Sequence, residues 1–147
     1  MEQVGFLQKR VYASIVAKVP VFCVDLVAVK DGKFLICKRV GRHPHDWWVP
    51  GGRVFKNETL LEAIKRKAME ELGATVTIYQ SISVYDNIFP ETHTPSVTFL
   101  VTLHEDEIAL DKQHSEYKYV SLAETEGMAV HQVLEDAMPI MKKLDLI

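Results

Sequence analysis

The chain has 147 residues, of which 48% are apolar and 25% are charged, and this balance excludes a disordered or fibrous protein. The formal net charge of −3 at pH 7 excludes the broad basic surface that binds nucleic acid polymers, so a small anionic ligand requires a local cluster of arginines and lysines. The length suits one domain with its own core, and we expect residues 1–147 to form it.

The sequence indicates a cytoplasmic location. No apolar run approaches the roughly 18 residues that a membrane span requires, and the N-terminus has no signal-peptide pattern. Cys23 and Cys37 lie in apolar runs, where buried reduced thiols are expected rather than a disulfide or a metal pair. We therefore expect a protein that is neither secreted nor membrane-bound.

An amphipathic helix and a β-hairpin are predicted at the start of the chain. Apolar residues recur near helical spacing over residues 5–18, and Pro20 ends this helix, which we expect to pack on the domain or on a second subunit. Residues 21–30 and 34–38 are rich in β-branched side chains and flank an Asp-Gly turn, which predicts a hairpin. Asp25 is a charge inside the first strand, so we expect it to lie at a sheet edge, to form a salt bridge or to contact a ligand.

A loop and a tight turn are predicted next. Residues 39–46 form a polar loop that carries Arg39, Arg42, His43 and His45. Pro50, Gly51 and Gly52 follow, and they predict a turn in which the glycines allow positive φ. Such a turn lets a ligand or an ion approach the bare backbone.

The central helix is predicted by its two ends. Thr59 followed by Glu62 is the pattern of a capping box, and Gly73 closes an apolar stripe of helical spacing. Farther on, we predict strands at residues 75–85, 97–104 and 116–121, and a terminal helix at residues 130–144 that is kinked at Pro139. The two prolines of the loop at residues 88–95 argue against strand pairing there.

The charges on the central helix have two interpretations. Lys67, Glu70 and Glu71 share one face, because residues three and four apart on a helix are neighbours. Two adjacent carboxylates beside a Gly-Gly turn suit a divalent cation, with a backbone carbonyl and phosphate oxygens completing its shell. Alternatively, Glu62, Arg66 and Glu70 form an exposed ladder of ion pairs, each worth about 0.3–0.5 kcal/mol. Spacing alone favours the ladder.

The order of residues around this helix resembles the signature of the Nudix hydrolases. Gly52, Glu58 and Arg66 stand at the signature's spacing, followed by Glu-Glu-Leu-Gly-Ala at residues 70–74. The resemblance implies an α/β fold, an α/β/α sandwich around a mixed sheet. It also implies cleavage of nucleoside diphosphates linked to another group, with Mg²⁺ or Mn²⁺ as the cofactor. Lys67 departs from the signature, which has a glutamate at that position.

This departure resembles the variant signature of one Nudix branch, the GDP-mannose mannosyl hydrolases. The likeness spans most of residues 6–121 and includes Asp25, Lys38-Arg39, the run from Trp48 to Arg53, the Gly-Gly-Arg-Val-x-Lys-Asn-Glu run at residues 51–58 and Asp111-x-Gln113-His114. The branch forms dimers, so the resemblance implies a homodimer, with the N-terminal helix suited to the interface.

The resemblance also implies a metal site. Gly51 would lend its backbone carbonyl to the ion, and Glu71 and Gln113 would be side-chain ligands. Glu70 is an additional carboxylate beside them, since the branch can do without one at that position.

The same resemblance implies roles in substrate binding and catalysis. Arg39, Arg53 and Arg66 would bear on the diphosphate or hold the metal-site carboxylate. His114 would be the general base, although a lone loop histidine is more often solvated. Asp25 would contact the substrate's sugar or base.

The function these residues imply is Mg²⁺-dependent hydrolysis of a nucleoside-diphosphate sugar, with GDP-mannose and GDP-glucose as leading candidates. In this branch water attacks the anomeric carbon and the nucleoside diphosphate leaves. The stretch at residues 85–96 lacks counterparts of the branch's loop histidine and tyrosine, so the sugar stays open. Two alternatives also stay open: a pyrophosphatase attacking phosphorus with Glu70 and Glu71, and a non-catalytic nucleotide-binding module.

Overall fold

The computed structural model describes residues 5–41 and 46–147, so the predicted loop residues Arg42, His43 and His45 lie outside the described residues. The elements in chain order are α1 (Lys9–Val16), β1 (Cys23–Lys30), β2 (Lys33–Arg39), β3 (Trp47–Trp48), β4 (Gly51–Arg53), α2 (Leu60–Leu72), β5 (Val76–Tyr85), β6 (Ser96–Leu103), β7 (His114–Val120), the 3-10 helix η1 (Ala123–Thr125), α3 (His131–Glu135) and α4 (Met138–Lys143).

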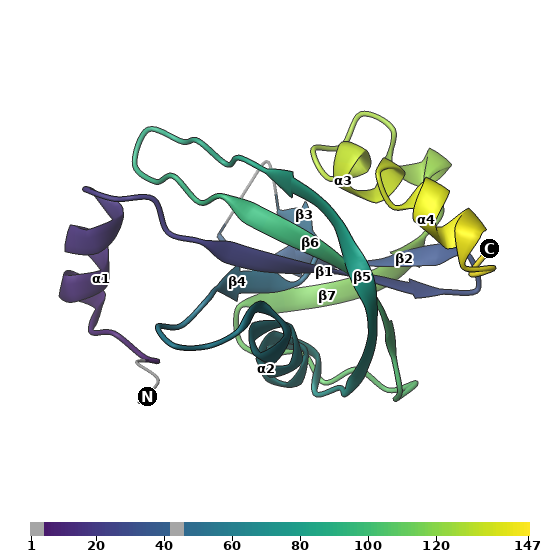
Figure 1. Ribbon diagram of the computed structural model, residues 1–147, viewed down its shortest axis with the longest axis horizontal. Coiled ribbons are helices and arrows are strands. Elements are labelled where there is room, and N and C mark those ends of the chain that lie inside the picture. Colours follow the sequence, from purple (N-terminus) through teal and green to yellow (C-terminus); the bar gives the residue numbers. More distant parts are fainter. Residues whose placement is uncertain (1–4, 42–45) are drawn as a thin grey trace.

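The strands form one mixed sheet at the centre of the molecule (Figure 1). Its order is β3-β2-β1-β6-β5, with β4 paired to β1 and β7 paired to β2. β1 and β6 are parallel, whereas the other pairs are antiparallel. The predicted hairpin is confirmed, because Val29 of β1 is opposite Phe34 of β2.

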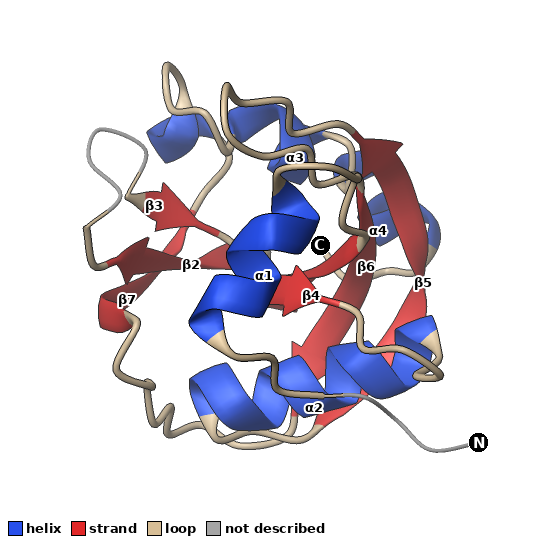
Figure 2. Ribbon diagram, turned by 90° about the vertical axis from the view of Figure 1, so that its left-hand side faces the viewer, coloured by secondary structure: helices blue, strands red, loops and turns tan. Residues whose placement is uncertain are grey.

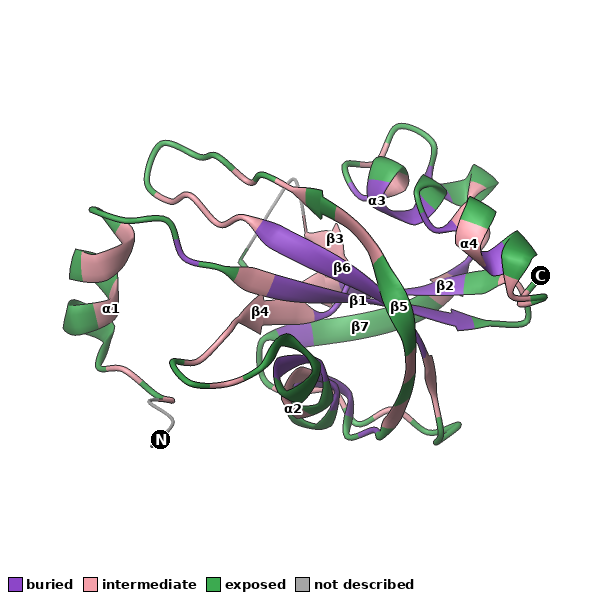
Figure 3. Ribbon diagram, viewed as in Figure 1, coloured by how far each residue is buried: buried purple, intermediate pink, exposed green. Residues whose placement is uncertain are grey.

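Helices cover both faces of the sheet, as expected for an α/β/α sandwich. Side chains alternate along β1, so Val24 and Leu26 join the core under α2, whereas Val27 and Val29 join the core under α3 and α4. Figure 3 shows β1 and β6 as the buried centre of the sheet between these layers. Fully burying one such aliphatic side chain stabilises the fold by about 1.5–3 kcal/mol.

Both predicted ends of the central helix are confirmed. The N–H of Glu62 donates to Thr59 Oγ1 at 3.1 Å, and the N–H of Thr59 donates to Glu62 Oε2 at 2.8 Å, which completes the capping box. Gly73 ends α2 in the left-handed region with φ 63°. These local signals fix where α2 starts and stops, and hence which side chains face the loop before it.

The predicted glycine turn is wrong. Gly51 and Gly52 belong to the short strand β4, which pairs with β1, and neither has a positive φ. A Cβ on Gly51 would lie 2.0 Å from Asp25 Oδ1 and 2.3 Å from the carbonyl oxygen of Val24. Glycine is therefore needed here for close approach of two strands rather than for turn geometry.

Two further segments differ from expectation. The terminal helix is not one kinked helix but two short ones, α3 and α4, and the break comes before Pro139, which sits in the first turn of α4. Proline is tolerated there because its missing N–H has no partner in a first turn. The loop at residues 88–95 contains an isolated antiparallel bridge between Ile88 and His93, so its prolines do not prevent pairing inside it.

The N-terminal helix α1 stands away from the sheet and its covering helices (Figures 1 and 2). It is shorter than predicted, and none of its residues is buried. Phe6 is 93% exposed and Val11 is 43% exposed. Its apolar side chains are thus not part of the core. Within the described ranges, no helix is long and apolar enough to cross a membrane.

Candidate active site

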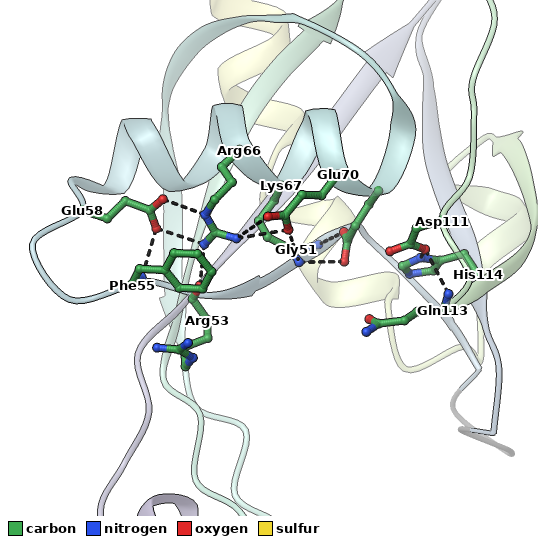
Figure 4. Close-up of polar contacts among 11 residues, drawn as sticks. Gly51, Arg53, Phe55, Glu58, Arg66, Lys67, Glu70, Asp111, Gln113 and His114 are labelled. Carbon is green, nitrogen blue, oxygen red and sulfur yellow. Dashed lines mark hydrogen bonds and ion pairs between the residues drawn. The ribbon is translucent and has the colours of Figure 1, made fainter. Parts of the chain in front are cut away.

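The loop before α2 is held against the helix by Arg66. Its Nε lies 2.6 Å from Glu58 Oε2, its Nη2 donates to Glu58 Oε1 at 2.9 Å, and its guanidinium lies 3.5 Å from the ring centroid of Phe55. Burial raises the pKa of Glu58, but the bonds from Arg66 and from the Phe55 N–H outweigh it, so the pKa of this carboxyl is below its ordinary value. Arg66 Nη2 also donates to the carbonyl oxygen of Arg53 at 2.8 Å, so Arg66 holds both the strand β4 and the loop residue Glu58 against α2 (Figure 4).

The other end of α2 carries a second charged group. Lys67 Nζ lies 3.3 Å from Glu70 Oε2 and 3.3 Å from Glu71 Oε1. Glu71 Oε2 accepts the backbone N–H of Gly51 at 2.8 Å. Burial raises the pKa of Glu71, although the charges of Lys67 and His114 and the Gly51 N–H act in the opposite direction.

Of the alternative ladder on α2, the pair of Arg66 and Glu70 is present, whereas Glu62 has another partner. The Glu62 carboxylate accepts the Thr59 N–H in the capping box. Arg66 pairs with Glu58 and also with Glu70, whose Oε2 lies 3.1 Å from Arg66 Nη1. Glu71, which the ladder does not include, is only 2% exposed. The charged face of α2 thus runs from the exposed Glu70 to the buried Glu71.

Glu71 meets two residues from the far side of the sequence. One potential ligand atom from each of Glu71, Asp111 and His114 lies within 4.8 Å of the others. His114 Nδ1 is 2.7 Å from Asp111 Oδ1, and the imidazole is 5% exposed. Two carboxylates and an imidazole, partly shielded from water, are a donor set that fits Mg²⁺ through oxygen or Mn²⁺ through oxygen and nitrogen.

Asp111 was not predicted as a site residue, although it stands in the Asp-x-Gln-His run. The available signal is its spacing of three residues from His114, which lets a short turn join the two side chains. Gln113 donates its backbone N–H to Asp111 Oδ1 at 3.2 Å, and its exposed side chain lies beside this pair in Figure 4. The structure therefore brings the predicted His114 to Glu71, and it holds the backbone of Gln113 against Asp111.

Asp25 is buried in the middle of the sheet, not at an edge. The Tyr85 hydroxyl donates to it, and the side chain of Trp48 is a further hydrogen-bond partner. Burial raises the pKa of Asp25 to about 7, with the charge of Arg39 opposing the rise and that of Glu71 adding to it. The Arg39 guanidinium lies 5.7 Å from the centroid of the Trp48 ring, and Trp48 packs against Tyr85. The predicted Asp25 and Arg39 thus lie beside the same pair of aromatic rings.

Arg53 shares the ring of Phe55 with Arg66 and contacts the N-terminal segment. Its guanidinium lies 4.7 Å from the ring centroid of Phe55 and 5.7 Å from that of Tyr12, and Nη2 donates to the carbonyl oxygen of Gly5 at 2.5 Å. Figure 4 shows it directed away from Asp111 and His114. In this arrangement Arg53 ties β4 to the N-terminal segment.

The sandwich, the loop held by Arg66 and the carboxylates at the end of α2 define a Nudix hydrolase. Residues 18–143 match the family model described as NUDIX domain, and the chain belongs to this family. It is thus a hydrolase of nucleoside diphosphate derivatives, of a family that typically uses a divalent metal ion.

Three similar proteins illustrate the range of relatives. The low-salt glycan biosynthesis protein Agl8 of Haloferax volcanii is 39% identical over 116 residues, which cover 73% of this chain and 74% of that protein. Phosphatase NudJ of Escherichia coli K12 is 30% identical over 95 residues, which cover 65% of this chain and 61% of NudJ. The crystal structure of a MutT NUDIX hydrolase from Burkholderia pseudomallei superposes with a TM-score of 0.66 at 26% identity, covering 72% of this chain and 86% of that one.

Proposed function

We propose that this Nudix hydrolase cleaves a nucleoside-diphosphate sugar, with GDP-mannose or GDP-glucose as the first candidates, into a nucleoside diphosphate and a free sugar. Water attacks the anomeric carbon. The observation that carries the proposal is the hydrogen bond from His114 to Asp111 at 2.7 Å beside Glu71, in a chain where Lys67 takes the place of a signature carboxylate. The glycan biosynthesis role in the name of the relative Agl8 supports a sugar-linked substrate.

The hydrogen bond to Asp111 prepares His114 to act as a base. A carboxylate can only accept, so the proton of this bond sits on Nδ1 and the lone pair is on Nε2. An imidazole held this way can take a proton from water near neutral pH, and such a base contributes about 10²–10⁴ in rate. Asp111 would also stabilise the imidazolium that forms.

Hydrolysis at the anomeric carbon forms one bond and breaks one bond at that atom. The water oxygen bonds to the anomeric carbon, the bond from that carbon to the diphosphate oxygen breaks, and the water proton goes to His114 Nε2. Positive charge grows on the sugar and negative charge on the leaving diphosphate. A bound divalent ion would supply charge neutralisation at the leaving diphosphate.

The remaining residues would bind and orient. Glu71, Asp111 and Gln113 would hold the ion with the carbonyl of Gly51, and Glu70 would be an additional carboxylate. Arg39 and Arg53 would bear on the diphosphate, and Asp25 would contact a polar group of the sugar or base. Arg66 would position Glu58 and Glu70 and thereby the site loop.

A second candidate is a pyrophosphatase that sends water to phosphorus. Glu70 and Glu71 side by side favour it, as does the name phosphatase of the relative NudJ. Hydrolysis in ¹⁸O-labelled water separates the two. Label in the free sugar, with unlabelled nucleoside diphosphate, supports attack at carbon. Nucleoside monophosphate and sugar phosphate, with label in a phosphate group, supports the alternative.

We further propose that the chain is a single Nudix domain that forms a homodimer through α1. The helix lies outside the segment that matches the family model and buries none of its residues on its own chain. Its exposed apolar side chains suit a second copy. Sedimentation equilibrium tests this: a dimer that Val11→Asp converts to a folded monomer supports it, and a wild-type monomer refutes it.

A further inference from the structure

Lys67 is directed into the metal-binding end of α2 rather than into solvent. Its side chain is 14% exposed, and its Nζ lies 3.3 Å from an oxygen of each of Glu70 and Glu71. A Cβ on Gly52 would lie 2.9 Å from Lys67 Cε and 3.1 Å from Nζ, so the lysine stem crosses directly over this glycine. The strand β4 has no side chain there, and the ammonium fills the space.

The ammonium is the cation that balances the two glutamates. Glu71 is 2% exposed, and a buried carboxylate needs a charged or hydrogen-bonding partner. On the helix it has Lys67 at one oxygen, while its other oxygen accepts the Gly51 N–H. Glu70 shares the same ammonium and also binds Arg66.

We propose that the Lys67 ammonium is a tethered cation that occupies the position between Glu70 and Glu71 where a divalent ion would otherwise bind. Among the described residues, this end of α2 then has room for a single divalent ion, on the side of Glu71 that faces Asp111 and His114. A second ion between the two glutamates is excluded, because it would stand against a fixed positive charge within the same pair of carboxylates. The inference deepens the proposed metal site and rests on the proposed function only in requiring a divalent ion.

The number of bound Mn²⁺ ions tests the proposal without reference to catalysis. Free Mn²⁺ is followed by electron paramagnetic resonance during titration of the full chain at pH 7, with no nucleotide present. We expect one site in the wild type. Lys67→Glu removes the tethered charge and adds a carboxylate beside Glu70 and Glu71, so we expect two sites.

Lys65→Glu is the matched control, because it makes the same charge change on an exposed position of the same helix. It should keep one site with an affinity within about twofold of the wild type. Lys67→Gln removes the ammonium without adding a carboxylate, so it should also open the second site, with a weaker Mn²⁺ affinity there than in Lys67→Glu. Circular dichroism confirms that each variant is folded.

Two results overturn the inference: two Mn²⁺ sites in the wild type, which requires no variant to fold, or a single site in folded Lys67→Glu. Product analysis is independent of both. If water is found to attack phosphorus while the wild type binds one ion and Lys67→Glu binds two, the proposed reaction fails and the role of Lys67 stands.

Discussion

The buried His114 pairs with the half-buried Asp111, and Nδ1 lies 2.7 Å from Oδ1. One potential ligand atom of each residue lies within 4.8 Å of a carboxylate oxygen of Glu71. A short turn before β7 thereby meets the end of α2. The pair would join the proposed base, His114, to the proposed metal ligand Glu71.

His114→Gln should lower kcat by about two to four decades while the fold stays intact, because the amide cannot take a proton from water. Steady-state rates with GDP-mannose and Mg²⁺ measure this, and circular dichroism checks the fold. His104, an exposed residue that bonds Thr75 and Thr77, provides the control, and His104→Gln should retain wild-type kcat. Full activity of His114→Gln would remove it from the role of base.

Asp111→Asn should lower kcat/KM about 10- to 100-fold, because the amide no longer fixes the Nδ1 proton of His114. Asp106→Asn is the control, because Asp106 is 93% exposed in its ion pair with Lys30. Wild-type kcat/KM in Asp111→Asn would show that Asp111 does not act through His114.

Glu58→Gln should reduce the free energy of unfolding by about 1.5–3 kcal/mol at pH 7, since a neutral amide replaces the carboxylate that binds the Arg66 guanidinium. The pKa of Glu58 is lowered in the folded state, so its contribution is complete above the unfolded value of about 4.3 and is lost as the pH falls through the folded value. Urea denaturation of the wild type and of Glu58→Gln from pH 7 down through the titration of Glu58 measures this. The difference between their free energies of unfolding should shrink below about pH 4. A difference that does not change with pH would contradict the assignment.

Gly51→Ala should destabilise the protein by about 1–3 kcal/mol, as overpacking does in a tight interior. The new methyl group would meet Asp25 Oδ1 and the Val24 carbonyl, which belong to a central strand that cannot move away. Gly52→Ala is the matched comparison. Its methyl meets only the flexible end of Lys67, so its cost in urea denaturation should be smaller. Equal costs would mean that close approach to β1 is not what requires glycine.

Local chemistry made α2 predictable. The capping box at Thr59 and the left-handed Gly73 each depend on residues within a few positions, and both were found where the sequence placed them. Strands β1, β2, β5, β6 and β7 followed from apolar or alternating runs, and their bounds differ from expectation by one or two residues. The short strands β3 and β4 were not predicted.

The site's long-range contacts were not predictable from spacing. Arg66 binds Glu58, eight residues away, because the loop folds back on the helix, and helical periodicity had offered only Glu62 and Glu70. Gly51 reads as a turn residue until its distance from β1 is known. Asp111 meets Glu71 only because β7 pairs with β2 and its preceding turn reaches across to α2.

The most direct test of the central claim is the position of the label after hydrolysis of GDP-mannose or GDP-glucose in ¹⁸O water with Mg²⁺. Mass spectrometry of the products should find one ¹⁸O in the free sugar and none in GDP. Label in a phosphate group, together with GMP and a sugar phosphate, would contradict attack at the anomeric carbon.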